Sequence, residues 1–142
     1  LLLIANNPAR RLHSQHDHGA HSQAGKVRDR EAIRLHPDDA TARGIADGDV
    51  VRVFNDRGAC LAGVVLDEAL SPGIAQLSTG AWYDPDEPSA EAPLCVHGNV
   101  NVLTPDRGTS RLAQGCTGQH ALVEVERHTG PVPSIRAYET PA

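Results

Sequence analysis

The sequence predicts a mainly β protein, built as a barrel or a sandwich with short helices and long polar loops. Short apolar stretches recur about every ten residues between glycine- and proline-rich turns, which is the spacing of strands in such folds. Several stretches alternate apolar and polar residues, as half-buried strands do. Aromatic residues make up only 3% of the 142 residues, so the core must consist of aliphatic side chains.

The first part of the chain contains two predicted strands separated by a long polar loop. Residues 1–5 form an apolar run that ends at an Asn-Asn-Pro turn. Residues 11–28 are polar and show no period, which is typical of a functional or a disordered loop. Residues 31–35 form the second strand. Residues 37–44 begin with proline and end with glycine, which predicts a brief helix.

The next strands form a predicted hairpin. Residues 50–55 alternate so that Val51 and Val53 share one face while Arg52 lies on the other. An Asn-Asp-Arg-Gly turn then leads into residues 59–66, the partner strand.

The following strand, residues 74–78, comes after a Ser-Pro-Gly turn. An acidic, proline-rich loop follows at residues 83–93. Residues 108–116 are expected to form one helical turn capped by Thr109, with Leu112 and Ala113 turned inward.

Residues 120–128 form the closing strand, with Ala121, Val123 and Val125 on one face. We therefore expect one domain over residues 1–128 and a loose C-terminal tail over residues 129–142, which contains three prolines.

The polar stretch "NPARRLHSQHDHGAH" at residues 7–21 holds half of the eight histidines. A zinc site would need three or four convergent ligands, and this stretch has neither cysteines nor a helix to align its imidazoles. A solvated loop and a ligand-binding loop remain the main alternatives. The guanidinium groups of Arg10 and Arg11, followed by His13, Ser14 and Gln15, suit phosphate oxygens and the edge of a heteroaromatic ring.

Two later stretches carry further candidate ligand-binding residues. In "LSTGAWYDP", Gly80 allows a flat ligand to approach the backbone closely, and Trp82 either stacks on it or packs in the core. The amides of Asn99, Asn101 and Gln119 offer both donors and acceptors, as a pterin or guanine edge requires. Asn99 follows a glycine, so a role in a turn is the alternative there.

The composition of the chain limits the kinds of partner that we expect. The net charge of −5 argues against a nucleic-acid surface, and no stretch is long enough to span a bilayer. The widely spaced Cys60, Cys95 and Cys116 indicate reduced thiols and a cytoplasmic protein, with the periplasm as the alternative. The sequence contains no methionine, from which we expect a piece of a larger protein.

Three stretches, "NPARRLHSQHDHG", "LSTGAWYDP" and "HGNVNVLTPDRGTSRLAQGCTGQ", closely resemble the C-terminal domain of molybdopterin oxidoreductases. The likeness is to the branch of dimethyl sulfoxide, trimethylamine N-oxide and biotin sulfoxide reductases. It covers about residues 1–127, including the less specific "GIADGDVVRV" stretch.

The resemblance implies a six-stranded double-psi β-barrel that closes over a bis(molybdopterin guanine dinucleotide) molybdenum cofactor together with domains absent from this chain. It implies no catalytic residue and no metal ligand here, since molybdenum takes its protein ligand from another domain. The cofactor-binding residues it implies are Arg11, His13, Ser14, Gln15, Gly80, Trp82, Asn99, Asn101 and Gln119.

The parent protein would then reduce small S-oxides or N-oxides by oxygen-atom transfer, and the isolated domain would be inactive. Its partners would be the remaining domains of the reductase and the small-molecule substrate, with no nucleic acid and no membrane. The alternatives are a stand-alone double-psi barrel adaptor for peptides or proteins, and a small protein that binds metal through its histidines.

Overall fold

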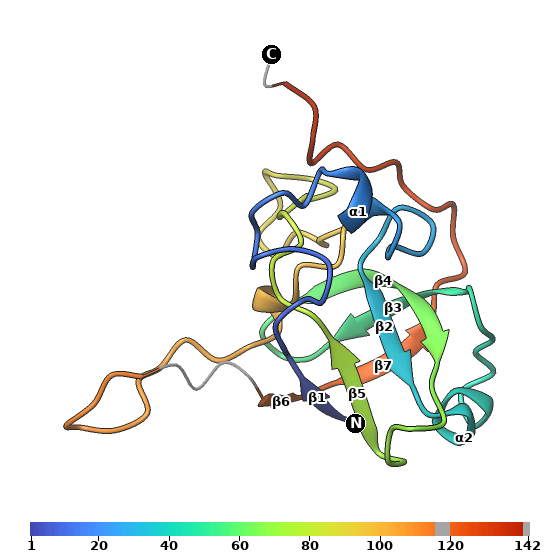
Figure 1. Ribbon diagram of the computed structural model, residues 1–142, viewed down its shortest axis with the longest axis horizontal. Coiled ribbons are helices and arrows are strands. Elements are labelled where there is room, and N and C mark those ends of the chain that lie inside the picture. Colours follow the sequence, from blue (N-terminus) through green and yellow to red (C-terminus); the bar gives the residue numbers. More distant parts are fainter. Residues whose placement is uncertain (116–119, 141–142) are drawn as a thin grey trace.

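A computed structural model describes residues 1–115 and 120–140 and shows a mainly β fold (Figure 1). Its strands form one mixed sheet in the order β6-β1-β5-β2-β4-β3-β7. The strands are β1 (Leu2–Ile4), β2 (Ala32–Leu35), β3 (Val50–Phe54), β4 (Ala59–Leu66), β5 (Ile74–Leu77), β6 (His120–Leu122) and β7 (Glu124–Arg127). The helices are α1 (Ala20–Gln23), α2 (Pro37–Thr41) and the 3-10 turn η1 (Val100–Val102).

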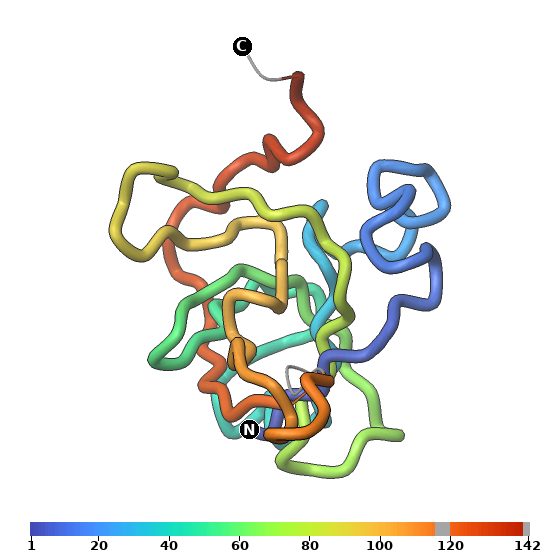
Figure 2. Tube along the Cα trace, turned by 90° about the vertical axis from the view of Figure 1, so that its left-hand side faces the viewer, coloured from blue at the N-terminus to red at the C-terminus, as the bar shows by residue number. Residues whose placement is uncertain are grey.

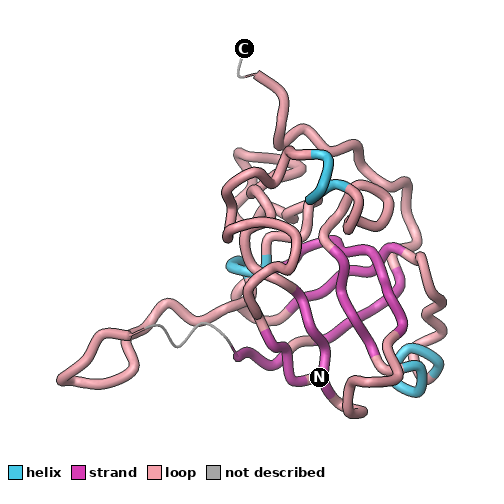
Figure 3. The backbone as a smooth tube through the Cα atoms, in the orientation of Figure 1, coloured by secondary structure: helices cyan, strands magenta, loops and turns pink. Residues whose placement is uncertain are grey.

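The sheet curls around the core because its two outermost members are neighbours in the chain (Figure 3). Strand β6 pairs with β1, and strand β7 pairs with β3. Only Val123 separates them, and it exchanges backbone hydrogen bonds with Leu1. The pairs β1–β5 and β2–β4 are parallel, whereas the other pairs are antiparallel.

The resemblance implied six strands, and the described residues contain seven. The difference arises at residues 120–128, where one closing strand was expected. The segment changes its pairing partner at Val123, from β1 to β3, so it is divided into β6 and β7. The predicted inward face is confirmed: Ala121, Val123 and Val125 are all buried.

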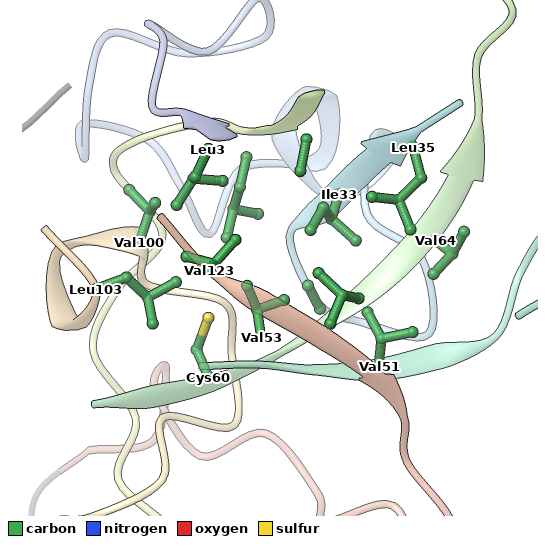
Figure 4. Packing of buried hydrophobic residues seen from close by; sticks show 14 of the residues in the cluster. Leu3, Ile33, Leu35, Val51, Val53, Cys60, Val64, Val100, Leu103 and Val123 are labelled. Carbon is green, nitrogen blue, oxygen red and sulfur yellow. The ribbon is translucent and has the colours of Figure 1, made fainter. Parts of the chain in front are cut away.

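The core is aliphatic, as the low aromatic content predicts (Figure 4). Val51 and Val53 on β3 are fully buried. Arg52, between them, lies outward with its guanidinium 4.0 Å from the centre of the Phe54 ring. The helix expected at residues 37–44 is the shorter α2, whose first turn is capped by His36: its Nδ1 accepts a hydrogen bond from the amide of Asp38.

The helical turn expected at residues 108–116 is wrong over its described part. Residues 108–115 contain no helix, and Leu112 and Ala113 are exposed. Side chains compete with the helix for the backbone: the Ser110 hydroxyl accepts from the amides of Leu112 and Ala113, and Thr109 Oγ1 accepts from the amide of Gly115. The result is a loop that projects from the sheet (Figure 1).

Two long polar segments lie at one end of the sheet (Figure 2). The segment between β1 and β2, which contains α1 within the expected loop, reaches this end, and so does the segment that follows β5. The described residues after β7, up to residue 140, return to the same end. No helix among the described residues combines the length and apolar character that crossing a membrane requires.

Candidate functional site

The loop that carries His13 and Ser14 is fixed against the segment following β5. The indole Nε1 of Trp82 donates to the carbonyl of Ser14 at 2.8 Å. Gly80 lies so close to the loop that a Cβ atom there would be 2.0 Å from the carbonyl oxygen of His13. Arg11 donates from Nη2 to the carbonyl of Thr79 at 2.8 Å. Two segments that lie far apart in the sequence therefore form one continuous surface.

A buried ionic cluster supports this surface from below. The Asp17 carboxylate lies 2.9 Å from Lys26 Nζ and 3.4 Å from Arg11 Nε. Glu31 Oε2 binds the same two cations, at 3.2 Å from Lys26 Nζ and 3.1 Å from Arg11 Nη2. The cluster thus pairs two cations with two carboxylates, which offsets much of the cost of removing their charges from water.

Two opposing effects act on the pKa of Asp17. Burial raises the pKa of its carboxyl group, but this effect is outweighed by the hydrogen bond and charge of Lys26 and by hydrogen bonds from Trp82 and Tyr138. The net result is a pKa below the ordinary value, so Asp17 is ionised at neutral pH. The loop therefore contains a buried negative charge at neutral pH.

A histidine that the sequence did not single out completes the site. His97 is fully buried, with Nδ1 2.8 Å from the carbonyl of Trp82 and Nε2 3.0 Å from the hydroxyl of Tyr138. Because a carbonyl only accepts, Nδ1 carries the proton. Burial and then the charge of Lys26 lower the pKa of His97, so the ring is neutral at pH 7.

We expect this histidine to make the protein less stable in mild acid. Because the folded pKa of His97 lies below its unfolded value of 6.5, the unfolded state binds more protons, and stability falls as the pH drops below about 6.5. Asp17 acts in a separate window, below its ordinary pKa of 3.8. Urea unfolding measured between pH 7.5 and 5 should show a shallower pH dependence in His97→Gln than in the original chain.

The matched control for that experiment is His21→Gln, because His21 is exposed. Its unfolding free energy should follow the same pH curve as that of the original chain. An unchanged pH dependence in His97→Gln would contradict the assignment of a neutral buried imidazole.

The predicted site residues divide into exposed and internal groups. The side chains of His13, Ser14 and Gln15 lie at the surface of the loop. By contrast, the Arg11 side chain is only 3% exposed, and its guanidinium group is engaged by internal partners. Arg11 therefore holds the loop in place from within.

The amide residues occupy a third segment. Asn99 Oδ1 accepts from the amide of Asn101 at 2.9 Å and caps η1, so the turn role is present, while Asn101 is exposed. Gly98 packs against Glu31, which places the start of this segment beside the ionic cluster. Gln119 lies outside the described residues.

The histidines of the loop do not gather around one point. The ring centres of His16 and His18 are 6.3 Å apart, and His18 packs instead against Trp82 at 5.7 Å. Within residues 1–115 and 120–140, no group of three or more histidine, cysteine, aspartate or glutamate side chains is placed to hold a metal ion.

A polar cleft runs along the other side of the loop. It has a volume of about 300 Å³ and is bordered by Asn6, Arg34 and Ser78. Arg10 lines the adjoining recess, where its side chain lies across Gly25. Arg34 already pairs with Asp67 on the border of this cleft, at 3.0 Å, so of the two guanidinium groups that of Arg10 suits an anionic ligand better.

Comparison of the sequence with known proteins identifies a family and several close relatives. The family model described as "Molydopterin dinucleotide binding domain" matches residues 1–122. The chain is 47% identical over 141 residues to the dimethyl sulfoxide/trimethylamine N-oxide reductase of Rhodobacter capsulatus, covering 99% of this chain and 17% of that protein. It is also 47% identical over 140 residues to the biotin sulfoxide reductase of Cereibacter sphaeroides, covering 98% of this chain and 18% of that protein.

These matches confirm the resemblance drawn from the three stretches, and the chain spans less than a fifth of the length of these relatives. A search of solved structures finds the fold in acetylene hydratase from Pelobacter acetylenicus, with a TM-score of 0.67 and 20% sequence identity. That likeness covers 90% of this chain and 18% of the hydratase chain.

Proposed function

The chain belongs to the molydopterin dinucleotide binding domain family, and from this premise we propose that it closes over a bis(molybdopterin guanine dinucleotide) molybdenum cofactor within a reductase of S-oxides or N-oxides. The observation that carries the proposal is the exposed His13-Ser14-Gln15 loop, which is hydrogen-bonded to Trp82 and lies against Gly80. The parent activity is inferred from relatives named as reductases of these compounds.

The donor set of this loop fits a pterin. Imidazole, hydroxyl and amide groups supply donors and acceptors for the edge of a heterocycle, and they extend from a backbone that is already ordered. Such preorganisation lowers the entropic cost of binding. Asn101, and Gln119 beyond the described residues, would contact the pterin from a second side.

Arg11 has a different part in this proposal from its neighbours. Its guanidinium group supports the loop and does not touch the ligand, because Asp17, Glu31 and two carbonyls already occupy it. Arg10 is the better candidate for the phosphates, since it lines the recess that adjoins the polar cleft.

We also assign the sheet to the six-stranded double-psi barrel class. Support comes from the two parallel pairs, β1–β5 and β2–β4, and from the direct succession of β6 and β7, which act as one strand shared by both ends of the sheet. In this arrangement residues 1–128 contain all the described strands of the domain.

The bound molybdenum would supply the oxygen-atom transfer, and this chain would bind and orient the cofactor. None of its described residues is assigned as a metal ligand. The projecting loop around Leu112, whose side chain is 100% exposed, would pack against the remaining domains of the parent reductase.

A titration tests the proposal directly. Oxidised molybdopterin guanine dinucleotide should quench the fluorescence of Trp82, the single tryptophan of the chain. The double variant Ser14→Ala with Gln15→Ala should bind about tenfold more weakly, because two ligand hydrogen bonds each contribute about 0.5–1.5 kcal/mol.

The control for the titration is Ser71→Ala, an exposed serine in the turn before β5. Its affinity should equal that of the original chain. Equal affinities in all three proteins would contradict the assignment of the loop to the ligand.

A further inference from the structure

The last described residues do not leave the domain after β7 but return to the loop end of the sheet (Figure 1). A loose tail was expected from residue 129. Instead, the guanidinium group of the buried Arg30 binds the carbonyl of Pro133, and Ile135 packs against the small apolar cluster of Val50, Leu61 and Val96. We call residues 133–139 the C-terminal strap.

The buried carboxylate of Asp84 anchors the strap. Its Oδ2 atom accepts hydrogen bonds from the amides of Arg136 and Ala137, at 2.6 and 2.9 Å. The Arg136 side chain adds a bond to the carbonyl of Pro85 at 2.7 Å. This anchorage sets the position of the next residue, Tyr138, which follows directly after these two amides.

Tyr138 is the point at which the strap meets the cofactor-binding loop. Its hydroxyl accepts from Gln23 Nε2 at 2.9 Å, and its single proton is shared between two acceptors, Asp17 Oδ2 at 2.9 Å and the unprotonated Nε2 of His97 at 3.0 Å. Its ring packs edge-on against Trp82, with ring centres 5.3 Å apart. One side chain thus joins the loop, α1, the segment after β5 and the His97 segment.

The chemistry of these contacts explains why a tyrosine suits this place. A phenol both donates and accepts, so one group serves the carboxylate of Asp17 and the amide of Gln23. Burial, and then the hydrogen bond and charge of Asp17, raise the pKa of Tyr138, so the hydroxyl keeps its proton. Phenylalanine could preserve the ring packing but none of the hydrogen bonds.

We propose that Tyr138 is a positioning residue for cofactor binding, and that the C-terminal strap belongs to the cofactor-binding site. It would act through Asp17 and Trp82, which fix the backbone of the His13-Ser14-Gln15 loop. This inference rests on the proposed function, because it assigns the strap to the same site.

The test compares Tyr138→Phe with Tyr83→Phe, a neighbouring tyrosine whose side chain is about half exposed. In Tyr138→Phe, the hydrogen-bonded amides of Gln15 and Gly19 should exchange with solvent about tenfold faster, since a hydrogen bond to a charged group is lost. Exchange in β3 should stay unchanged, and the emission of Trp82 should shift to longer wavelength as its packing loosens. Tyr83→Phe should leave all of these readouts unchanged.

The same samples are titrated with oxidised molybdopterin guanine dinucleotide. Binding to the original chain with about tenfold weaker binding to Tyr138→Phe supports the proposal. Unchanged loop exchange in Tyr138→Phe overturns the positioning role even if the ligand binds. If loop exchange is faster but the original chain binds no ligand, the proposed function is refuted. The assignment of the strap to the cofactor-binding site then fails as well.

Discussion

Replacing Gly80 with alanine should both destabilise the protein and abolish tight binding of the pterin nucleotide. Gly80 has a φ of +92°. Alanine in this backbone conformation costs about 1–2 kcal/mol of stability. The added Cβ would also lie 2.0 Å from the carbonyl oxygen of His13 and 2.9 Å from the amide nitrogen of Ser14. Since these are backbone atoms, the loop must move, with an overpacking cost of about 1–3 kcal/mol.

The chain offers a matched control at Gly73. Its φ is +87°, yet a Cβ there would meet no atom within 4 Å. Gly73→Ala should therefore lose only the conformational part of the stability and bind the nucleotide normally. Urea unfolding and the Trp82 titration measure both effects. Equal losses in the two variants would mean that the close approach of Gly80 to the loop has no consequence.

Asp17→Ala should have the largest effect on stability, lowering the free energy of unfolding by about 3–5 kcal/mol at pH 7. The carboxylate is fully buried and is shared by Lys26 and Arg11. Without it, two buried cations would share the single carboxylate of Glu31. The amide of Trp82 and the hydroxyl of Tyr138 would also lose an acceptor.

The control for this variant is Glu68→Ala, an exposed carboxylate in the turn before β5. Its removal should change the unfolding free energy by less than about 0.5 kcal/mol. A similarly small effect in Asp17→Ala would contradict the account of a charged cluster that supports the loop.

The strands could be predicted because their signals are local. The alternation of apolar and polar residues predicted that Val51 and Val53 are buried, and the turn residues on either side of β4 predicted where that strand begins and ends. The same local reasoning failed at residues 108–116, where Thr109 was expected to cap a helix. The Ser110 hydroxyl captured the amides that a helix would have used.

The supporting network of the site could not be predicted, since burial of a charged residue depends on partners that lie far away in the chain. Asp17 stands among histidines in a stretch that looks solvated, yet Lys26, Trp82 and Tyr138 converge on it. His97 likewise appears as one polar residue in a mixed segment. Only the tertiary structure shows that its ring joins Trp82 to Tyr138.

The central claim is that exposed side chains of the loop, together with the segments at Gly80 and Asn99, form one surface for a pterin dinucleotide. Mapping of backbone amide chemical shifts in the ¹⁵N-labelled chain, with and without oxidised molybdopterin guanine dinucleotide, tests it most directly. We predict shifts concentrated at residues 13–15, 80–82 and 99–101. Shifts confined to α2 and the turn before β5, at the opposite end of the sheet, would contradict the account.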